Sequence, residues 1–399
     1  MPPHPAGARS NSASTRDPTA RMKLLLVTND FPPRIGGIED YVDQLLRHLP
    51  AEVRATVLGP PHPDAAAHDV TFPHRVVRWP RGPLLPTAAL TNAVVDLAAR
   101  ERPDVVLFGA ALPLALMAGS VAERTRIPVV AFTHGVEPAA ALLPGGSILL
   151  RRIARHATLT VVSSWAERRL RHAIGDVPLM ALPSGVDATR FHPGVRGHDV
   201  RVRHHLEGVP LVVGVSKLVA RKGHDLTIRA WPSVRSRVPG ARLLIVGDGP
   251  DRARLEGLAR NLGVADAVTF TGVVSPEDLP AHFAAGDVFA MPNRARWFGL
   301  DDEALGAVFL QAAAVGRPVV AGDAGGAVEA IVDGITGQLT DGHDHQALAD
   351  VLVRLLGDPA YASRLGRAGA RRIQEAFTWQ RMANRLHGLL QELGGARRR

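Results

Sequence analysis

A carboxylate and an amide stand eight positions apart in "DDEALGAVFLQAAAVGRPVV" (residues 301–320), where Glu303 closes an acidic run and Gln311 follows in an apolar stretch. We expect a loop through Glu303, a helix that starts within residues 304–307, and a helix end at Gly316. The axial rise from Glu303 to Gln311 would then be up to about 12 Å, close to the reach of a nucleotide sugar from hexose to ribose. Glu303 is therefore a candidate to bind sugar hydroxyls, and Gln311 a candidate to bind the ribose.

Two sources of positive charge would accompany these residues. Amide groups at a helix N-terminus favour negative charge, so the first turn of the predicted helix would face the phosphates. The amides concerned are those of Leu305, Gly306, Ala307 and Val308. Only three of the 47 basic residues are lysines, and two of them, Lys217 and Lys222, fall in "SKLVARKG" directly after a predicted strand. They could neutralise a diphosphate and stabilise it as a leaving group, with a solvated loop as the alternative.

Two further motifs lie where predicted strands end. "VTNDFPPRIGG" (residues 27–37) places Gly36 and Gly37 before a helix. Glycine lets the backbone approach a phosphate or a sugar, and an ordinary strand-to-helix turn is the alternative. His134 ends "PVVAFTHG", which would bring an imidazole to the same edge of a sheet, although with 17 histidines in the chain a structural role stays open.

Several kinds of chemistry are disfavoured. The chain lacks cysteine, which excludes disulfides, thiolate metal sites and cysteine nucleophiles. The dinucleotide fingerprint fails at residues 27–37 and again at "GDGPDRARLEG", where Arg252 stands at the third glycine position, so an oxidoreductase is disfavoured. His343 and His345 could ligate a metal, but a polar turn explains "DGHDHQ" better. We expect no metal and no cofactor.

The composition is that of a globular protein, with 46% apolar and 21% charged residues. The formal net charge of +9 fits nucleic acid, anionic lipid or a GC-rich genome. Nucleic acid is disfavoured, because only 5% of the residues are aromatic and no nucleic-acid motif appears. Residues 105–122 are uncharged and of membrane-spanning length, but a buried strand ending near Gly109 and a helix after Pro113 explain them better.

Short β-branched segments alternate with helical patterns along the whole chain, which is typical of parallel sheets covered by helices on both faces. The alternation restarts after residues 182–194, so we predict two doubly wound domains in tandem with a hinge near residues 185–200. Ser164 and Glu167 form a capping-box pattern that predicts a helix N-terminus. Ligands of such sheets bind at the carboxyl ends of the strands, which places the site in the cleft between the domains.

These motifs resemble the retaining glycosyltransferases of the two-Rossmann-domain GT-B group, in family 4, whose mark is Glu, seven residues and another Glu. The likeness extends to actinobacterial phosphatidyl-myo-inositol mannosyltransferases, which use GDP-mannose. The resemblance rests on blocks spread over both domains: "VTNDFPPRIGGIEDY", "FTHGVE", "PSGVDATRFHPG", "SKLVARKGHD" and "GLDDEALGAVFLQAAAVGRPVVAGDAGGA". It implies an α/β fold with two Rossmann-like domains facing across a cleft.

The resemblance also implies a division of the chain and a role for each candidate residue. The Pro-, Ser- and Ala-rich composition of residues 1–21 itself predicts a disordered leader. The parts implied by the resemblance are an N-terminal acceptor domain (22–185), a hinge (186–205), a C-terminal donor-nucleotide domain (206–375), and a C-terminal helix and basic tail (376–399) that pack back on the N-terminal domain. The implied roles are a loop over the phosphates for Gly36 and Gly37, donor-sugar contact for His134, diphosphate binding for Lys217 and Lys222, sugar binding for Glu303 and ribose binding for Gln311. Transfer would retain configuration without a protein nucleophile, the departing diphosphate oxygen helping to deprotonate the acceptor.

Three positions depart from the family pattern. Lys217 replaces an arginine, Gln311 replaces the second glutamate, and Val328 replaces the proline usual before Glu329. The first change exchanges a bidentate phosphate contact for a point charge. The second removes charge assistance from the ribose contact, a loss of about 1 to 2 kcal/mol. These changes predict a weakened or altered donor site rather than an inactive one.

The resemblance predicts transfer of a hexose, mannose from GDP-mannose, to a phosphatidylinositol-type acceptor. Three alternatives stay open: a relative that uses a UDP, ADP or TDP sugar on a soluble glycan or natural product, a non-catalytic nucleotide-sugar binder, and a nucleotide-sugar epimerase of similar two-domain shape. A lipid acceptor requires a membrane surface, and residues 151–172 carry six arginines against one glutamate. We therefore expect a cytoplasmic enzyme with peripheral contact to an anionic inner membrane face.

Overall fold

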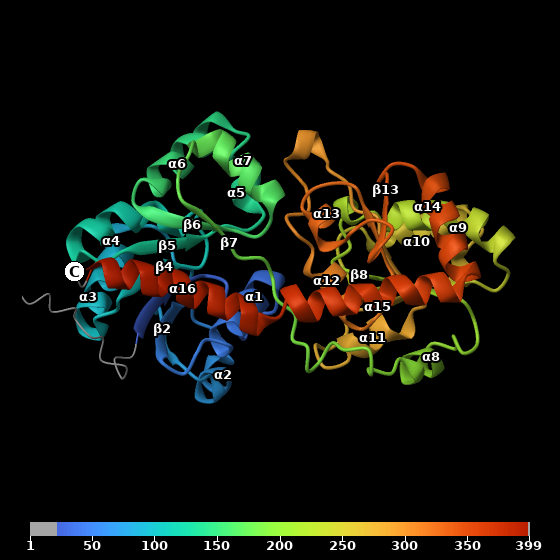
Figure 1. Cartoon of the computed structure of the whole chain (residues 1–399), viewed down its shortest axis with the longest axis horizontal. Helices are drawn as coiled ribbons and strands as arrows, with labels where there is room; N and C mark the ends of the chain where they lie inside the picture. The colour runs from blue at the N-terminus through green and yellow to red at the C-terminus, as the bar shows by residue number, and fades with distance from the viewer. Residues whose placement is uncertain (1–21, 398–399) are drawn as a thin grey trace, which may run out of the picture.

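The computed structural model describes residues 22–397, with side chains through residue 395. The predicted leader, residues 1–21, and the end of the predicted basic tail lie outside the described residues. The described chain forms two lobes side by side (Figure 1), each built on one parallel sheet.

The first lobe has a seven-stranded sheet in the order β3-β2-β1-β4-β5-β6-β7. Its strands are β1 (Met22–Val27), β2 (Val53–Gly59), β3 (Arg75–Arg78), β4 (Val105–Phe108), β5 (Val129–Phe132), β6 (Ala157–Val161) and β7 (Leu179–Ala181). The second lobe has a six-stranded sheet in the order β10-β9-β8-β11-β12-β13. Its strands are β8 (Leu211–Val215), β9 (Arg242–Val246), β10 (Val268–Gly272), β11 (Val288–Met291), β12 (Val319–Gly322) and β13 (Gly337–Thr340).

Helices cover both faces of each sheet. In the first lobe they are α1 (Gly37–Arg47), α2 (Ala65–Thr71), α3 (Ala88–Glu101), the 3₁₀ turn η1 (Leu114–Met117), α4 (Ala118–Thr125), α5 (Val136–Ala140), α6 (Pro144–Ala154) and α7 (Ser164–Ile174). In the second they are α8 (His198–Arg203), η2 (Ala220–Lys222), α9 (His224–Arg237), α10 (Arg252–Asn261), η3 (Ala265–Ala267), α11 (Leu279–Ala285), η4 (Trp297–Gly299), α12 (Ala307–Ala314), α13 (Ala327–Ala330), α14 (His345–Gly357) and α15 (Pro359–Ala376). The last helix is α16 (Trp379–Arg397).

Both strand orders reverse direction beside the first strand of their sheet, between β1 and β4 and between β8 and β11. Ligands bind at such reversal points, outside the carboxyl ends of the strands. The central strands β4, β5 and β8 are continuously buried and almost entirely apolar, as parallel strands covered on both faces must be. Two doubly wound Rossmann-like domains, as predicted from the alternation, are confirmed.

The uncharged run at residues 105–122 divides into strand β4, turn η1 and the start of α4, in agreement with the sequence analysis. Within residues 22–397, no helix is both long and apolar enough to cross a membrane.

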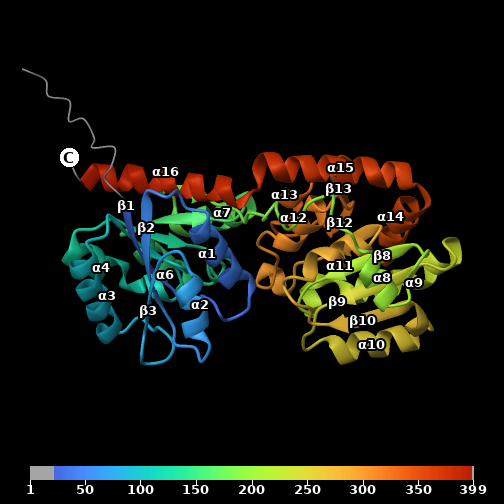
Figure 2. The same ribbon diagram turned by 90° about the horizontal axis from the view of Figure 1, so that it is seen from below.

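The chain crosses between the lobes twice, and the two crossings lie side by side. Val186 donates its amide to the Phe377 carbonyl at 2.7 Å and pairs with Thr378 as an isolated bridge. Helix α15 covers the second lobe and α16 continues across the first (Figure 2). Trp379, Met382, Leu386 and Leu390 of α16 are buried in a core cluster with residues of α1 and β4.

The segment expected to be a hinge, residues 186–205, packs mostly on the second lobe. Phe191 and Val200 belong to its core, and the guanidinium of Arg201 donates to the Ala285 carbonyl at 2.8 Å. The crossing itself is therefore shorter than the sequence indicated, close to Val186.

Candidate active site

A buried ion pair occupies the centre of the predicted site. The Lys222 ammonium contacts Oε2 of Glu303, and both side chains are nearly enclosed. Arg221 adds a second cation, with Nε 3.9 Å from the same Glu303 oxygen and a terminal nitrogen 3.2 Å from Oδ1 of Asp301. The sequence placed Lys222 and Glu303 in separate motifs, and the fold brings them into direct contact.

Glu303 lies in a loop and not at the start of a helix. The sequence predicts a helix that begins within residues 304–307, and α12 starts at the last of these residues, Ala307. Gly306 precedes it in the left-handed region at φ 81°, a conformation that favours glycine. Gln311 is thus about one turn into α12, and the predicted helical rise of about 12 Å from Glu303 does not apply.

Tertiary hydrogen bonds hold the Glu303 loop away from the helix. The Gly326 amide donates to the Glu303 carbonyl at 2.7 Å, and the Ser163 hydroxyl donates to the Ala304 carbonyl at 2.7 Å. A Cβ on Gly326 would lie 1.9 Å from the Ala304 oxygen, so only glycine permits this approach. These carbonyls are therefore taken by other segments and are not available to a helical turn.

The acidic neighbour Asp302 supports the loop. Its Oδ1 accepts from the Glu303 amide at 2.8 Å, and Arg169 of α7 lies 4.0 Å from Oδ2. Burial nevertheless raises the pKa of Asp302 above its usual value. Asp302 and Arg169 connect the loop to the first lobe.

Helix α12 presents one face to the open side of this site. Its half-buried residues Ala307, Val308 and Gln311 recur at helical spacing, whereas Phe309, Leu310 and Ala312 are buried in the core. The first amides of a helix have no partner within it, which leaves those of Gly306 to Val308 suited to an anion, whereas Leu305, expected in the same turn, precedes the N-cap Gly306.

Lys217 lies on the same loop as Lys222 but in a different environment. It is exposed, and its backbone carbonyl accepts from the Val219 amide at 2.9 Å. Among residues 22–395, its ammonium has no contact with Glu303 or with another carboxylate within ion-pair distance. The structure therefore brings Lys222, but not Lys217, to Glu303.

His134 follows β5 on the first lobe and is held firmly. Its Nε2 lies 2.9 Å from the Gly109 carbonyl, to which it donates, and its ring packs edge-on against Tyr41 at 5.4 Å. The buried Glu137 carboxylate accepts from the His134 amide at 2.8 Å. A Cβ on Gly135 would lie 3.9 Å from Cβ of Ala304, so this turn faces the Glu303 loop.

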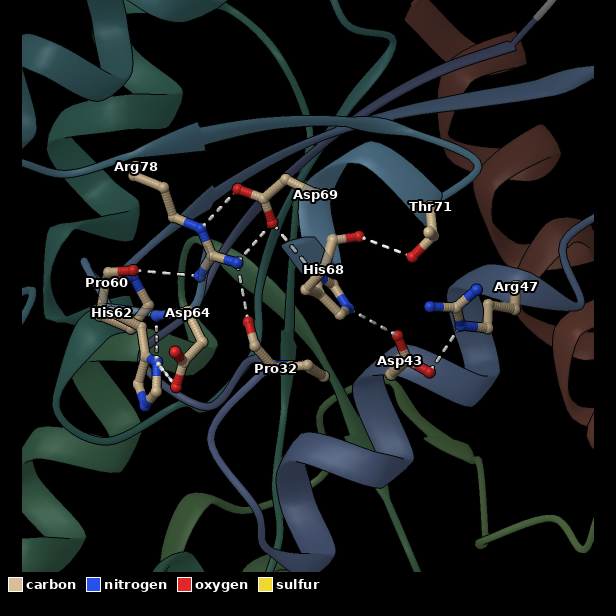
Figure 3. A network of polar contacts seen from close by, with 10 residues as sticks. All are labelled: Pro32, Asp43, Arg47, Pro60, His62, Asp64, His68, Asp69, Thr71 and Arg78. Atoms are coloured by element: carbon tan, nitrogen blue, oxygen red, sulfur yellow. Dashed lines mark hydrogen bonds and ion pairs between the residues drawn. The ribbon is translucent and has the colours of Figure 1, made fainter. Parts of the chain in front are cut away.

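The paired glycines lie at the start of α1 without strained backbone. Gly36 is extended at φ 178°, and a Cβ on Gly37 would meet no atom within 4 Å. Arg78 anchors the preceding turn from behind (Figure 3), donating to the Pro32 carbonyl at 2.7 Å and to both carboxylate oxygens of Asp69. Burial alone would raise the pKa of Asp69, but hydrogen bonds from Arg78 and His68 hold it below its usual value.

His224 packs against the loop that carries Lys217 and Lys222. This buried imidazole begins α9, and its Nε2 lies 2.7 Å from the Ser216 hydroxyl. Burial, together with the nearby Lys222 charge, lowers the pKa of His224 to about 4. The ring is therefore neutral at physiological pH and adds no charge to the site.

The two histidines considered for a metal, His343 and His345, belong to no candidate metal-binding group among the described residues. His343 Nδ1 lies 3.3 Å from Asp341, and His345 begins α14 on the surface. In the part of the chain that is described, no group of three or more His, Asp or Glu side chains could hold a metal ion.

Sequence reasoning missed several residues of the site. Arg221 was overlooked beside Lys222, and Ser163 was overlooked because the capping box was assigned one residue too late. The N-cap of α7 is Ser163, whose hydroxyl accepts from the Ala166 amide, while Glu167 pairs with Arg171. A run of two serines before a helix carries the signal of an N-cap but not its register.

The fold and this site define a two-domain nucleotide-sugar glycosyltransferase. A solved structure, HepE of Anabaena in complex with UDP, matches with a TM-score of 0.79 and 20% identity over 93% of this chain and 100% of that one, a likeness in fold. The family model "Glycosyl transferases group 1" matches residues 198–372, and "Glycosyltransferase Family 4" matches residues 35–190. The chain belongs to this glycosyltransferase family.

Two relatives match nearly full length. The GDP-mannose-dependent monoacylated alpha-(1-6)-phosphatidylinositol monomannoside mannosyltransferase of Corynebacterium glutamicum is 40% identical over 94% of this chain and 99% of its own length. The GDP-mannose-dependent alpha-(1-6)-phosphatidylinositol monomannoside mannosyltransferase of Mycolicibacterium smegmatis is 42% identical over 92% of this chain and 98% of its own. The predicted family and the predicted hexosyltransferase class are thereby confirmed.

Proposed function

We propose that this enzyme transfers mannose from GDP-mannose to a phosphatidylinositol or phosphatidylinositol-mannoside acceptor. The observation that carries the proposal is the buried contact between Lys222 and Glu303 in a chain whose near full-length relatives include the mannosyltransferases named above. A cation and a sugar-binding carboxylate in contact can hold a sugar and its leaving phosphate together.

In the proposed reaction, Glu303 binds hydroxyls of the hexose and Lys222 stabilises the negative charge that develops on the departing diphosphate. The amides of Gly306 to Val308 add the partial positive charge of a helix N-terminus. His134 contributes from the facing lobe, beside the Glu303 loop, and Gln311 binds the ribose. The departing phosphate oxygen accepts the proton of the acceptor hydroxyl.

This arrangement supports a further proposal, that transfer requires no metal and no resident cofactor. Lys222, Arg221 and the N-terminus of α12 supply positive charge where a divalent ion would otherwise act. We expect transfer rates to be equal in EDTA and in Mg²⁺. A strict requirement for the ion would contradict this proposal and leave the donor assignment intact.

The acceptor would be reached from an anionic membrane surface, through α6 and its neighbours. Leu142 and Leu143 are exposed just before this helix and Ile148 within it, while the exposed Arg152 lies in its last turn and Arg155 directly after it. Exposed apolar and basic side chains on one short helix fit an interfacial segment. We expect salt-sensitive binding to vesicles that contain phosphatidylinositol, weakened in an Arg152→Glu/Arg155→Glu variant.

Internal contacts on α6 and α7 reduce the number of arginines that are free to face lipid. Arg151 donates to the Ala173 carbonyl at 2.6 Å, Arg169 to the Gly299 carbonyl at 2.6 Å, and Arg171 pairs with Glu167 at 2.9 Å. Half of the six arginines predicted to face lipid are therefore engaged within the protein. Arg151→Glu is the matched control, and equal weakening by it would indicate structural damage.

The decisive experiment is calorimetric titration with GDP, UDP, ADP and TDP, followed by the matching sugar nucleotides. Binding of GDP and GDP-mannose alone, followed by transfer to phosphatidylinositol in vesicles, is the expected result. Preference for UDP with transfer to a soluble acceptor would overturn the proposal. Binding without transfer or donor hydrolysis would instead indicate a non-catalytic binder.

A further inference from the structure

A carboxylate of the second lobe binds the N-terminus of a helix in the first lobe. Glu329 of α13 accepts from the Ser164 amide at 2.8 Å and from the Trp165 amide at 2.7 Å, one bond to each carboxylate oxygen. Ser164 and Trp165 are the first residues of α7, which has eleven residues. Amides at this position have no partner within the helix and favour negative charge.

The first turn of α7 is thereby fully hydrogen-bonded in this arrangement of the lobes. The Ser163 hydroxyl accepts from the Ala166 amide at 3.1 Å, and Glu329 accepts from the two amides before it. If the lobes separated, the Ser164 and Trp165 amides and the Glu329 carboxylate would hydrogen-bond to water instead of to each other. The two bonds are therefore specific to the closed arrangement.

The contact between Glu329 and α7 is linked by two hydrogen bonds to the loop that carries Glu303. Three residues before Glu329, the Gly326 amide donates to the Glu303 carbonyl at 2.7 Å. On the other side, Ser163 precedes the bound amides and its hydroxyl donates to the Ala304 carbonyl at 2.7 Å. The same two segments, α7 and residues 326–329, thus meet each other and both hold the loop that carries Glu303.

Helix α15 fixes α13 from behind. The Arg372 guanidinium donates to the Glu329 and Ala330 carbonyls, both at 2.7 Å, and leaves the Glu329 carboxylate to α7. Burial lowers the pKa of Arg372, which nonetheless stays a cation in any physiological condition. These two hydrogen bonds hold the backbone that carries the Glu329 side chain in place.

We propose that Glu329 is a positioning residue for sugar transfer, which holds the lobes closed through α7 and so keeps Glu303 in place for the donor. The activity readout of this inference rests on the proposed function, whereas the closure itself does not. Two charge-assisted hydrogen bonds at a half-exposed site make a change of roughly tenfold in the ratio of closed to open molecules reasonable. Glu329→Ala loses both bonds, and Glu329→Gln loses the charge and one bond, because its NH2 group cannot accept from an amide.

A substitution in the opposite lobe removes one of the same bonds without touching Glu329. Ser164→Pro deletes the amide that donates to Glu329, at the first position of a helix, where proline is well tolerated. The preceding Ser163 is extended at φ −160° and ψ 158°, as a residue before proline prefers. Ser164→Ala keeps the amide and is the matched control.

Closure is measured without any substrate. The chain has no cysteine, so single cysteines at the exposed Arg155 and His345 accept one nitroxide label in each lobe. Electron–electron double resonance then gives the distribution of distances between the lobes. We expect the wild type and Ser164→Ala to share one short distance, and Glu329→Ala, Glu329→Gln and Ser164→Pro to add a longer population, largest in Glu329→Ala.

Activity and stability separate positioning from simple damage. Once the donor is known, we expect Glu329→Ala and Ser164→Pro to lower kcat/KM about tenfold while the melting temperature stays unchanged, and Glu329→Asp to restore part of it. Identical distance distributions in Glu329→Ala and wild type would overturn the inference, as would Ser164→Pro behaving like Ser164→Ala. A failure of the mannosyltransferase proposal would leave the distance measurement unaffected.

Discussion

Lys222 and Glu303 form a buried ion pair although they are 81 positions apart in the chain. The pair joins the loop after β8 to the loop before α12, across the carboxyl ends of the second sheet. Arg221 lies close enough to share the Glu303 charge, at 3.9 Å. A donor phosphate would therefore compete with Glu303 for Lys222, while Arg221 keeps the carboxylate from being left unpaired.

Loss of the Lys222 charge should affect catalysis much more than loss of its neighbour on the same loop. We expect Lys222→Met to lower kcat about 100-fold, because a fixed charge on the leaving phosphate acts mainly in the transition state. Lys217→Met is the control, with a loss of tenfold or less, since Lys217 is exposed. Steady-state kinetics check the difference, and equal losses would contradict the assignment of the diphosphate to Lys222.

Replacing Gln311 by the glutamate of the family pattern should strengthen binding of the donor nucleotide. We expect Gln311→Glu to bind the donor nucleotide about tenfold more tightly, because a carboxylate accepts charge-assisted bonds from ribose hydroxyls. Gln311→Met should bind more weakly than wild type, since it can accept no such bond. Calorimetric dissociation constants decide the matter; an unchanged value for Gln311→Glu would place the ribose elsewhere.

His224 should make the protein less stable in mild acid. Its folded pKa of about 4 lies below the ordinary 6.5, so the unfolded chain binds the proton first as the pH falls. Stability contributed by the neutral ring is complete above about pH 6.5, and about 2 kcal/mol of it is lost by pH 5. Lys222 opposes protonation, whereas Asp225 and Asp251 favour it.

The measurement is the free energy of unfolding in denaturant at pH 7 and pH 5. A His224→Gln variant should show a smaller decrease between these two values than wild type, whatever its absolute stability. His343→Gln is the control, because His343 is exposed beside Asp341. Equal pH dependence in His224→Gln and wild type would show that other groups dominate.

Gly326 should tolerate no side chain. A Cβ there would lie 1.9 Å from the Ala304 carbonyl and 2.8 Å from the Ser163 hydroxyl, so the Glu303 loop or α7 must move. We expect Gly326→Ala to cost about 1 to 3 kcal/mol and to lower sugar transfer. Gly257→Ala is the control within helix α10, where the nearest atom would be 3.8 Å away and alanine should stabilise by about 1 kcal/mol.

Both variants are compared by denaturant unfolding and by activity. A Gly326→Ala protein with wild-type stability and wild-type activity would mean that the loop has another arrangement of equal energy.

Local patterns determined much of this protein. Alternating apolar strands and amphipathic helices predict two parallel doubly wound sheets, because each strand is buried on both faces and each helix on one. The motifs at residues 216–223 and 301–320 predict a sugar-nucleotide site, because the strands before them end at one edge of the sheet. These features depend on neighbours in sequence, which are visible in the printed chain.

Only the tertiary structure decided where α12 begins, which lysine meets Glu303, and what Glu329 binds. The helix pattern extends to Ala304, but the Gly326 amide and the Ser163 hydroxyl bind the carbonyls of Glu303 and Ala304. Lys217 and Lys222 look alike in sequence, and the turn η2 directs Lys222 alone to the carboxylate. Each outcome depends on hydrogen-bonding groups that distant segments supply, and no local pattern encodes their position.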